Sequence, residues 1–276
     1  MDWLTTWEIP VGKTAKIVFD WLKLNYKADF RDFGNAIKGG IEGLSDVLQW
    51  MPGLFLVALF VAVTWVIQRR WQSCLIVLLC YLFIMNQGYW AKTTETLALV
   101  AFVCAICMAI GVPIGVAVAH RPRLFSAMQP VLDLMQTLPA PVYLIPFVIL
   151  FGIGVVPALF ASIIFVVPTS IRLTHLGVST TPTALLEAAA AFGATKRQML
   201  WKVELPFAFP QIMAGLNQTI MLSLSMVVIS AWVGAAGLGV PVVEALNRVR
   251  PDQGFEAGSV IVALAIALDR MLRVTK

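Results

Sequence analysis

Charged residues are scarce in this chain of 276 residues. Only 13% of the residues are Asp, Glu, Lys or Arg, whereas soluble domains carry roughly 25%. Hydrophobic residues make up 59% of the chain and the mean hydropathy is +0.85. One water-soluble core of this length cannot bury so much apolar sequence, so we expect lipid to be the solvent and the fold to be an all-α membrane protein.

The basic balance of the chain does not indicate a nucleic-acid partner. The net charge is +5 and the isoelectric point is near 9.2. Binding to nucleic acid requires a basic face on a soluble domain, but the bases here lie in short clusters between apolar runs. We therefore predict no nucleic-acid partner, and we attribute the basic clusters to membrane topology.

Residues that carry catalysis or bind metals are also few. The chain has two histidines, His120 and His175, and neither has a Ser or Cys at the spacing of a catalytic triad. A C-x-x-C at 104–107 lies in an apolar run without further zinc ligands nearby. The chain lacks G-x-x-x-x-G-K-[ST], and GAAGLG at 234–239 fits a loop turn better than a nucleotide site. We predict no catalytic residue, no metal site and no cofactor in this chain.

Apolar runs long enough to cross a membrane are abundant. A helix needs about 20 residues to cross ~30 Å of hydrocarbon. The Arg69-Arg70 pair divides the first two runs, which favours two spans joined by a tight loop over a re-entrant pair. Prolines interrupt the fourth and fifth runs, so we expect these in the bundle interior, where freed backbone groups find partners. We predict about seven transmembrane helices, at 50–68, 71–86, 95–119, 129–150, 155–172, 208–232 and 256–272.

The loops between these runs predict the orientation. With seven spans, one side carries eleven bases and four acids, and the other nine bases and eleven acids. The positive-inside rule makes the first side cytoplasmic. The N-terminus is then outside and the C-terminus inside, and Arg172 and His175 belong to cytoplasmic loops.

We divide the chain into three parts. In residues 1–49, apolar residues recur at helical spacing between Lys and Asp. This pattern predicts one or two amphipathic helices lying on the membrane surface, or a helix packed on the outer face of the bundle. Residues 50–86 form two accessory transmembrane helices, and residues 87–276 form a five-helix core with a cytoplasmic loop at 181–206.

The loop at 181–206 has a helix–turn–helix pattern. TALLEAAAAF follows Pro182, a residue that starts helices well. Gly193 can adopt a left-handed conformation and end this helix, and T-K-R-Q from Thr195 matches a capping box for the next one. Leu205-Pro206 marks a break before the long span at 208. A helix this short needs a partner to be stable, so either it docks on another protein or the segment is a solvated amphipathic loop.

This segment resembles the EAA loop of permease subunits in binding-protein-dependent ABC importers. The acid-alanine-alanine triplet, the glycine and the Leu-Pro pair all match at the family's spacing. Further stretches between residues 85 and 273 are similar to the glycine betaine, proline betaine and choline subfamily, and AHRPRL at 119–124 most resembles its choline branch. The resemblance implies a type I importer permease fold and assigns coupling to an ATPase to Glu187, Ala188, Ala189, Phe192, Gly193, Leu205 and Pro206.

The resemblance also implies partners. A permease of this kind works as a homodimer in lipid, in the bacterial inner membrane. It works with two ATPase subunits in the cytoplasm, which consume ATP and Mg²⁺, and with an extracytoplasmic substrate-binding protein. In this family an aromatic cage for the quaternary ammonium belongs to the binding protein. Tyr143 and Trp232 could form a cage here, but aromatic residues at span ends are mostly interfacial anchors.

Polar residues inside the spans are candidates for a translocation pathway. Asp133 pairs structurally with Arg172 or Arg121, or it guides a cation electrostatically. Polar residues on the sixth span either bond between helices or line a transient cavity. The candidate pathway residues are Asp133, Gln136, Thr137, Pro139, Tyr143, Asn217, Ser223 and Met226.

We therefore expect the permease subunit of an ATP-driven importer of quaternary ammonium compounds, with choline favoured and glycine betaine close behind. One alternative is a self-sufficient secondary transporter of small cations, which would be expected to carry an intramembrane acid or inverted repeats. Others are an ABC permease for a different osmolyte or amino acid, and a membrane scaffold without transport.

Overall fold

The computed structural model describes residues 11–273, and within them the chain is helical without strands. The element order is α2 (Val11–Trp50), α3 (Gly53–Gln68), α4 (Trp71–Asn86), α5 (Trp90–Ala119), α6 (Pro122–Thr137), α7 (Ala140–Phe151), α8 (Val155–Ser179), α9 (Thr183–Ala191), α10 (Lys196–Met199), the π-helix η1 (Leu200–Glu204), α11 (Leu205–Ala231), α12 (Gly239–Asn247) and α13 (Pro251–Leu272). The expected all-α fold is confirmed. Residues 1–10 and 274–276, which include both termini, lie outside the described residues.

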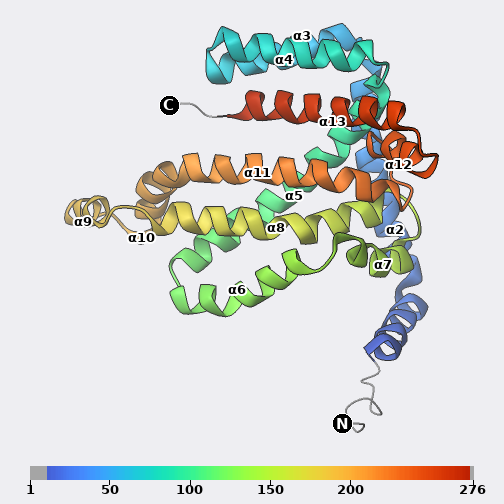
Figure 1. Cartoon of the computed structure of the whole chain (residues 1–276). Coiled ribbons are helices and arrows are strands. Elements are labelled where there is room, and N and C mark those ends of the chain that lie inside the picture. The colour runs from blue at the N-terminus through green and yellow to red at the C-terminus, as the bar shows by residue number, and fades with distance from the viewer. Residues whose placement is uncertain (1–10, 274–276) are drawn as a thin grey trace, which may run out of the picture.

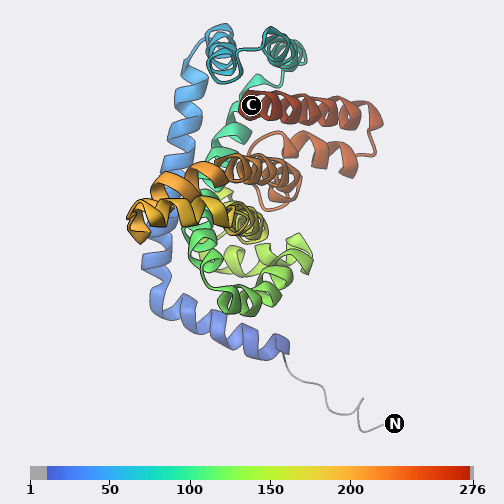
Figure 2. The ribbon, with the colours of Figure 1, turned by 90° about the vertical axis from the view of Figure 1, so that its left-hand side faces the viewer.

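The long helices run side by side, and one helix crosses their end (Figure 1). Helices α3, α4, α8, α11 and α13 lie roughly parallel, with α5 oblique to them. Helix α2 stays perpendicular to this bundle in both ribbon views (Figures 1 and 2). The chain then bends by 102° from α2 into α3. The C-terminal half of α2 packs on α5 and α7, and its Ile41 lies in the core beside α5.

Three of the described helices, α5, α8 and the run Lys196–Ala231, are long and apolar enough to cross a membrane. The number rises to five if each bent helix pair counts as one span. The expectation of about seven spans exceeds this number. Helices α3 and α4 have 16 residues each, or about 24 Å at 1.5 Å per residue, which is less than the hydrocarbon thickness. Helix α13 carries charged residues near both ends.

The boundaries of the remaining apolar runs need three corrections. The run at 129–150 is two helices, α6 and α7, bent by 88°. The bend falls at Leu138-Pro139, because a residue before proline is driven out of the helical region. Arg172 and His175, assigned above to loops, lie inside α8, which continues to Ser179. Leu205-Pro206 does not break the chain, because helix continues from Lys196 to Ala231.

Helices α5 and α8 pack more extensively than any other pair. Gly111 and Gly115, one helical turn apart, face Ser170 and Thr174 on α8. A Cβ atom added at Gly115 would lie 2.6 Å from the Thr174 Cβ and 2.8 Å from the Ile171 carbonyl oxygen. Small residues at this spacing let two membrane helices approach closely enough for dispersion forces to hold them. Buried residues of α5, α8 and α2, among them Leu99, Val103, Leu159, Val166 and Ile41, form one core cluster around this contact.

The turns at the two ends of the bundle gather different segments. The α3–α4 turn, the α5–α6 turn, α9 and the C-terminal end of α13 lie at one end, and α2, α12 and the α7–α8 turn lie at the other (Figure 1). The GAAGLG segment is a turn between α11 and α12, as predicted, and the Thr96 hydroxyl accepts a hydrogen bond from the Leu238 N–H at 2.9 Å.

We predict that Gly115→Ala destabilises the protein by about 1–3 kcal/mol, because the added methyl group forces α5 away from α8. The matched control is Gly258→Ala in α13, where an added Cβ meets nothing within 4 Å. Alanine there should be neutral or stabilise by up to about 1 kcal/mol. Unfolding in mixed detergent micelles measures both variants, and equal effects would contradict the close-contact interpretation.

Candidate functional site: the projecting helix and the polar α6–α8 contact

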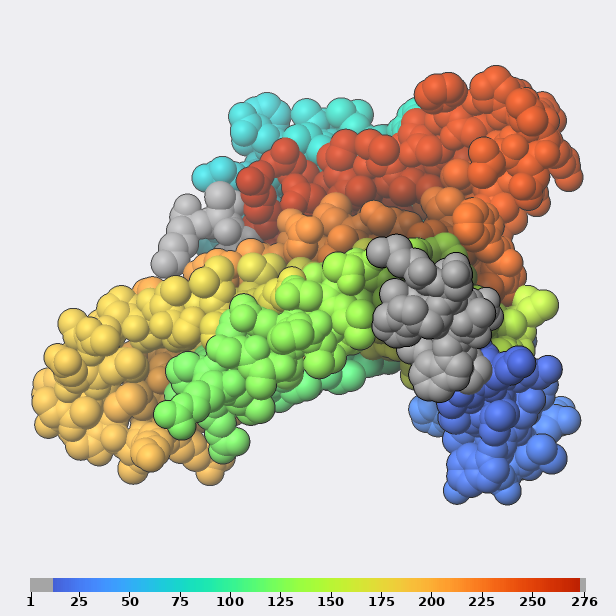
Figure 3. Space-filling model, turned by 60° about the horizontal axis from the view of Figure 1, so that its bottom comes forward, coloured from blue at the N-terminus to red at the C-terminus, as the bar shows by residue number. Residues whose placement is uncertain are grey.

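The segment 181–206 projects from one end of the bundle (Figure 3). Helix α9 contains no buried residue. Phe192, directly after it, is 93% exposed, although it is a large apolar side chain. Glu187 forms no ion pair or hydrogen bond with the described part of the chain. An apolar side chain at the tip and an unpaired acid beside it are features that a partner surface could bind.

Local hydrogen bonds fix the shape of this segment. Gly193 has φ of 78°, and the Gly193 and Ala194 N–H groups donate to the carbonyls of Ala190 and Ala189 at 2.9 and 3.0 Å. The predicted capping box is confirmed. The Gln198 N–H donates to the Thr195 hydroxyl at 3.3 Å, and the Thr195 N–H donates to the Gln198 side-chain oxygen at 2.9 Å. The turn between α9 and α10 is therefore held by local hydrogen bonds of the backbone and of the Thr195 and Gln198 side chains.

A π-helix joins the projecting segment to α11. Residues Leu200–Glu204 form η1, and the Leu205 N–H donates to the Leu200 carbonyl five residues earlier. Pro206 follows in the first turn of α11. Proline has no N–H to continue an ordinary helical ladder, and a π-turn just before it keeps the chain helical. The sequence predicted a break here because π-turns have no recognisable signal of their own.

A histidine–glutamate pair anchors η1 to the bundle. Glu204 is buried, and its two carboxylate oxygens lie 2.9 and 3.2 Å from Nε2 of His120. Nδ1 of His120 lies 2.9 Å from the Val116 carbonyl oxygen, which can only accept. Both ring nitrogens thus face acceptors, which suits an imidazolium beside a carboxylate. The pair joins the C-terminal end of α5 to the base of the projecting segment. Because the two residues are 84 positions apart, the sequence did not predict this contact.

Four side chains form a polar contact between α6 and α8. Arg172 donates from one guanidinium nitrogen to Asp133 at 2.6 Å and from another to the Gln136 side-chain oxygen at 3.0 Å. The Gln136 amide donates to the Thr169 hydroxyl at 3.0 Å. The pairing of Asp133 with Arg172 agrees with the structural alternative considered above. The forked guanidinium holds two residues of α6 at once, so this contact fixes α6 against α8.

The other candidate pathway residues are not gathered at this contact. The Thr137 and Tyr143 hydroxyls both donate to the Leu134 carbonyl, and Pro139 lies at the α6–α7 bend. On α11, Ser223 and Met226 are buried in the packed bundle. Asn217 donates to Asp269 on α13 at 2.6 Å. The structure therefore brings Asp133 and Gln136 together at the α6–α8 contact, and Thr137 and Tyr143 together at the Leu134 carbonyl. Tyr143 also packs against the cluster that contains Met226. The pathway role of all eight residues stays a prediction.

Apolar helices of spanning length and a projecting charged segment fit a membrane protein with a polar extension. The chain belongs to the family described as binding-protein-dependent transport system inner membrane component, whose model matches residues 111–272. This family comprises multi-pass transport components rather than catalytic subunits.

Permease proteins of glycine betaine transport systems are similar to this chain over most of its length. Glycine betaine transport system permease protein OpuAB of Bacillus subtilis is 42% identical over 95% of this chain and 93% of its own length. Glycine betaine/carnitine transport permease protein GbuB of Listeria monocytogenes is 45% identical over 88% of each chain. A solved structure of the MetNI methionine ABC transporter, in an inward-facing conformation, matches with a TM-score of 0.59 and 25% identity, over 71% of this chain and 98% of that one. The expected type I importer permease fold is thereby confirmed.

We predict that His120 and Glu204 are energetically coupled. A double-mutant cycle with His120→Ala and Glu204→Ala, measured by unfolding in mixed micelles, should give a coupling energy of about 0.5–3 kcal/mol. The matched control is the exposed pair Lys38–Glu42, whose atoms are 3.6 Å apart. An exposed pair at this helical spacing should give about 0.5 kcal/mol or less. Equal coupling in the two cycles would mean that Glu204 is not an anchor.

Proposed function

We propose that this chain is the permease subunit of an ATP-driven importer of quaternary ammonium compounds, with glycine betaine as the favoured substrate. The observation that carries the proposal is the projecting, unpartnered helix α9 with its exposed Phe192, in a chain that belongs to a transport family. Two ATPase subunits would hydrolyse ATP with Mg²⁺, and an extracytoplasmic binding protein would deliver the substrate. The permease itself would work as a homodimer in lipid.

The charge distribution supports the orientation. The α3–α4 turn contains Arg69 and Arg70, the α5–α6 turn contains Arg121, and these turns lie at the same end as α9 and the C-terminal end of α13 (Figure 1). These two short turns carry arginines and no acid, which favours the cytoplasmic side for that end. Helix α9 and the C-terminus would then face the cytoplasm, and α2 and the α7–α8 turn would face outside.

We assign the coupling role to Glu187, Ala188, Ala189, Phe192, Gly193, Leu205 and Pro206. In a type I importer, motion of the ATPase must reach the spans through a protruding element, and the segment 181–206 is held as a rigid unit by its capping box and by the His120–Glu204 pair. A rigid element can transmit a rotation to α8 and α11, the two long helices that it joins. We also propose the division of the chain into an N-terminal segment (1–49), two accessory helices (50–86) and a permease core (87–276).

The comparisons favour glycine betaine over choline. Two relatives named for glycine betaine transport, OpuAB and GbuB, are 42% and 45% identical over 95% and 88% of this chain. A choline transport system permease protein, OpuBD of Bacillus subtilis, is 32% identical over 59% of it. Choline remains the second candidate, because AHRPRL at 119–124 resembles that branch.

We predict that Phe192→Ala and Glu187→Lys each reduce the co-purified ATPase by about tenfold or more. Loss of an apolar anchor, or an unpaired charge in an interface, costs about 2 kcal/mol or more. The matched control is Glu244→Lys, because Glu244 is exposed on α12 at the opposite end of the bundle. Phe192 is too exposed to affect folding, so retention of the ATPase by Phe192→Ala would argue against the proposed contact.

Reconstitution tests the substrate. Proteoliposomes containing this chain, its ATPase and its binding protein should take up labelled glycine betaine only with internal ATP, and should prefer it to choline. Uptake that stops with a proton uncoupler while ATP is held constant would instead indicate a secondary transporter. Uptake of neither compound would reject the proposed substrate class.

A further inference from the structure

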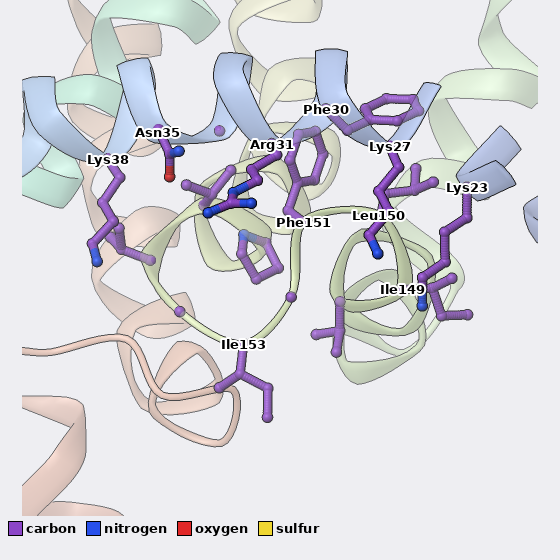
Figure 4. A pocket seen from close by; sticks show the side chains of 17 residues that line it. Lys23, Lys27, Phe30, Arg31, Asn35, Lys38, Ile149, Leu150, Phe151 and Ile153 are labelled. Carbon is purple, nitrogen blue, oxygen red and sulfur yellow. The ribbon is translucent and has the colours of Figure 1, made fainter. Parts of the chain in front are cut away.

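Four cationic side chains line a hollow at the end of the bundle opposite α9. The hollow has a volume of about 440 Å³ and lies between α2 and the α7–α8 turn. Figure 4 shows that Lys23, Lys27, Arg31 and Lys38 all extend from α2 toward this turn. Lys27, Arg31 and Lys38 follow each other at intervals of four and seven residues, so they share one face of α2. Lys23 reaches the hollow from the other side of a kink at Tyr26. Volumes of about 300–1,000 Å³ are usual for small-ligand sites.

This hollow contains no acidic side chain. Its remaining lining consists of Asn35, Phe30, Gly34 and residues Val148–Pro157. The acids of the same stretch, Asp29 and Asp32, are not among the lining residues. Lys23, Lys27 and Arg31 form no ion pair with the described part of the chain, and only Lys38 has one, with Glu42. The cations therefore repel one another unless an anion binds among them.

The wall of the hollow opposite α2 is the N-terminus of α8, whose backbone dipoles add to the positive potential of the cations. Gly154 is the N-cap of the 25-residue helix α8, without a side-chain cap, and Val155, Val156 and Pro157 of its first turn line the hollow. The N-terminus of a helix carries a partial positive charge and favours anions. Gly152 and Gly154 adopt φ of 81° and 146°, and their lack of a side chain leaves the turn open to a ligand.

Apolar side chains beside the hollow point to a lipid as the source of the anion. Towards its N-terminal end, α2 exposes Ile17, Val18, Trp21 and Leu24, and Leu24 is 83% exposed. These positions form one stripe of the helix. Figure 3 shows this part of α2 extending beyond the bundle. A helix with an apolar stripe and lysines beside it has the pattern of a helix at the lipid–water boundary.

We propose that this hollow binds the phosphate headgroup of an anionic phospholipid, with α2 lying in the interface. A glycerol phosphodiester brings a negative charge that offsets part of the repulsion among these cations. A zwitterionic headgroup, or a betaine, would also place an ammonium group among the same cations, so it fits less well. The lipid site is separate from the transport proposal, which supplies only the assignment to the outer leaflet.

Calorimetric titration of the full-length chain in nonionic detergent tests this site. The probes are dioctanoyl phosphatidylglycerol, dioctanoyl phosphatidylcholine and inorganic phosphate. We expect phosphatidylglycerol to bind about tenfold or more tightly than phosphatidylcholine, and this preference to weaken as salt is raised. Binding of inorganic phosphate as tight as that of the lipid would show a site for soluble anions and overturn the lipid assignment.

Variants separate this hollow from general surface charge. Lys23→Gln/Lys27→Gln/Arg31→Gln should weaken phosphatidylglycerol binding about tenfold or more, because each lost contact is charge-assisted. The matched control Lys92→Gln/Arg248→Gln/Arg250→Gln also removes three charges, and it should bind like the wild type. The proposal fails if both variants behave alike. It also fails if the first variant keeps lipid binding but loses the substrate-binding protein, which would make the hollow a protein-docking surface.

The same preparations distinguish this proposal from the transport proposal. ATP-driven uptake without any preference for phosphatidylglycerol would reject the lipid site and leave the importer intact. A lipid preference that the first variant abolishes, in a protein that transports no quaternary amine, would support the lipid site and reject the importer proposal.

Discussion

The close packing of α5 on α8 is the contact on which the rest of the structure depends. In lipid, apolar side chains gain little by leaving the solvent, so helices associate through tight contacts between small residues. Gly111 and Gly115 provide that contact, and Ser170, on the facing helix, donates a hydrogen bond to the Cys107 carbonyl at 3.0 Å. Helix α8 is also the best buried of the three long apolar helices. Because both functional regions are attached to the ends of α8, its position against α5 sets the position of each.

One end of α8 leads into a segment built to keep its shape outside the bundle. Helix α9 has no fully buried residue, so its stability depends mainly on alanine-rich helix propensity, on the glycine turn and on the capping box of α10. The π-helix then carries the chain past Pro206 without a break, and the pair of His120 with Glu204 attaches that π-helix to α5. A partner that moved α9 would therefore act on three long helices, α5, α8 and α11, through short and well-defined connections.

The other end of α8 faces a different set of side chains. There the helix N-terminus, an open glycine turn and four cations of α2 surround one hollow (Figure 4). The two ends are thus chemically distinct. One presents an exposed phenylalanine and a free carboxylate, which suit a protein surface, and the other presents concentrated positive charge beside an apolar stripe, which suits an anionic interface.

The sequence by itself determined the class of solvent, the order of the helices and the local shape of the projecting segment. These features depend on composition and on neighbours a few residues apart, as the capping box of Thr195 with Gln198 and the left-handed Gly193 illustrate. Pairs of distant residues were decided only by the tertiary structure. The contact of His120 with Glu204 and the grouping of α2 cations against the α7–α8 turn depend on how whole helices pack. That packing is governed by shape complementarity between helix surfaces, which no short stretch of sequence contains.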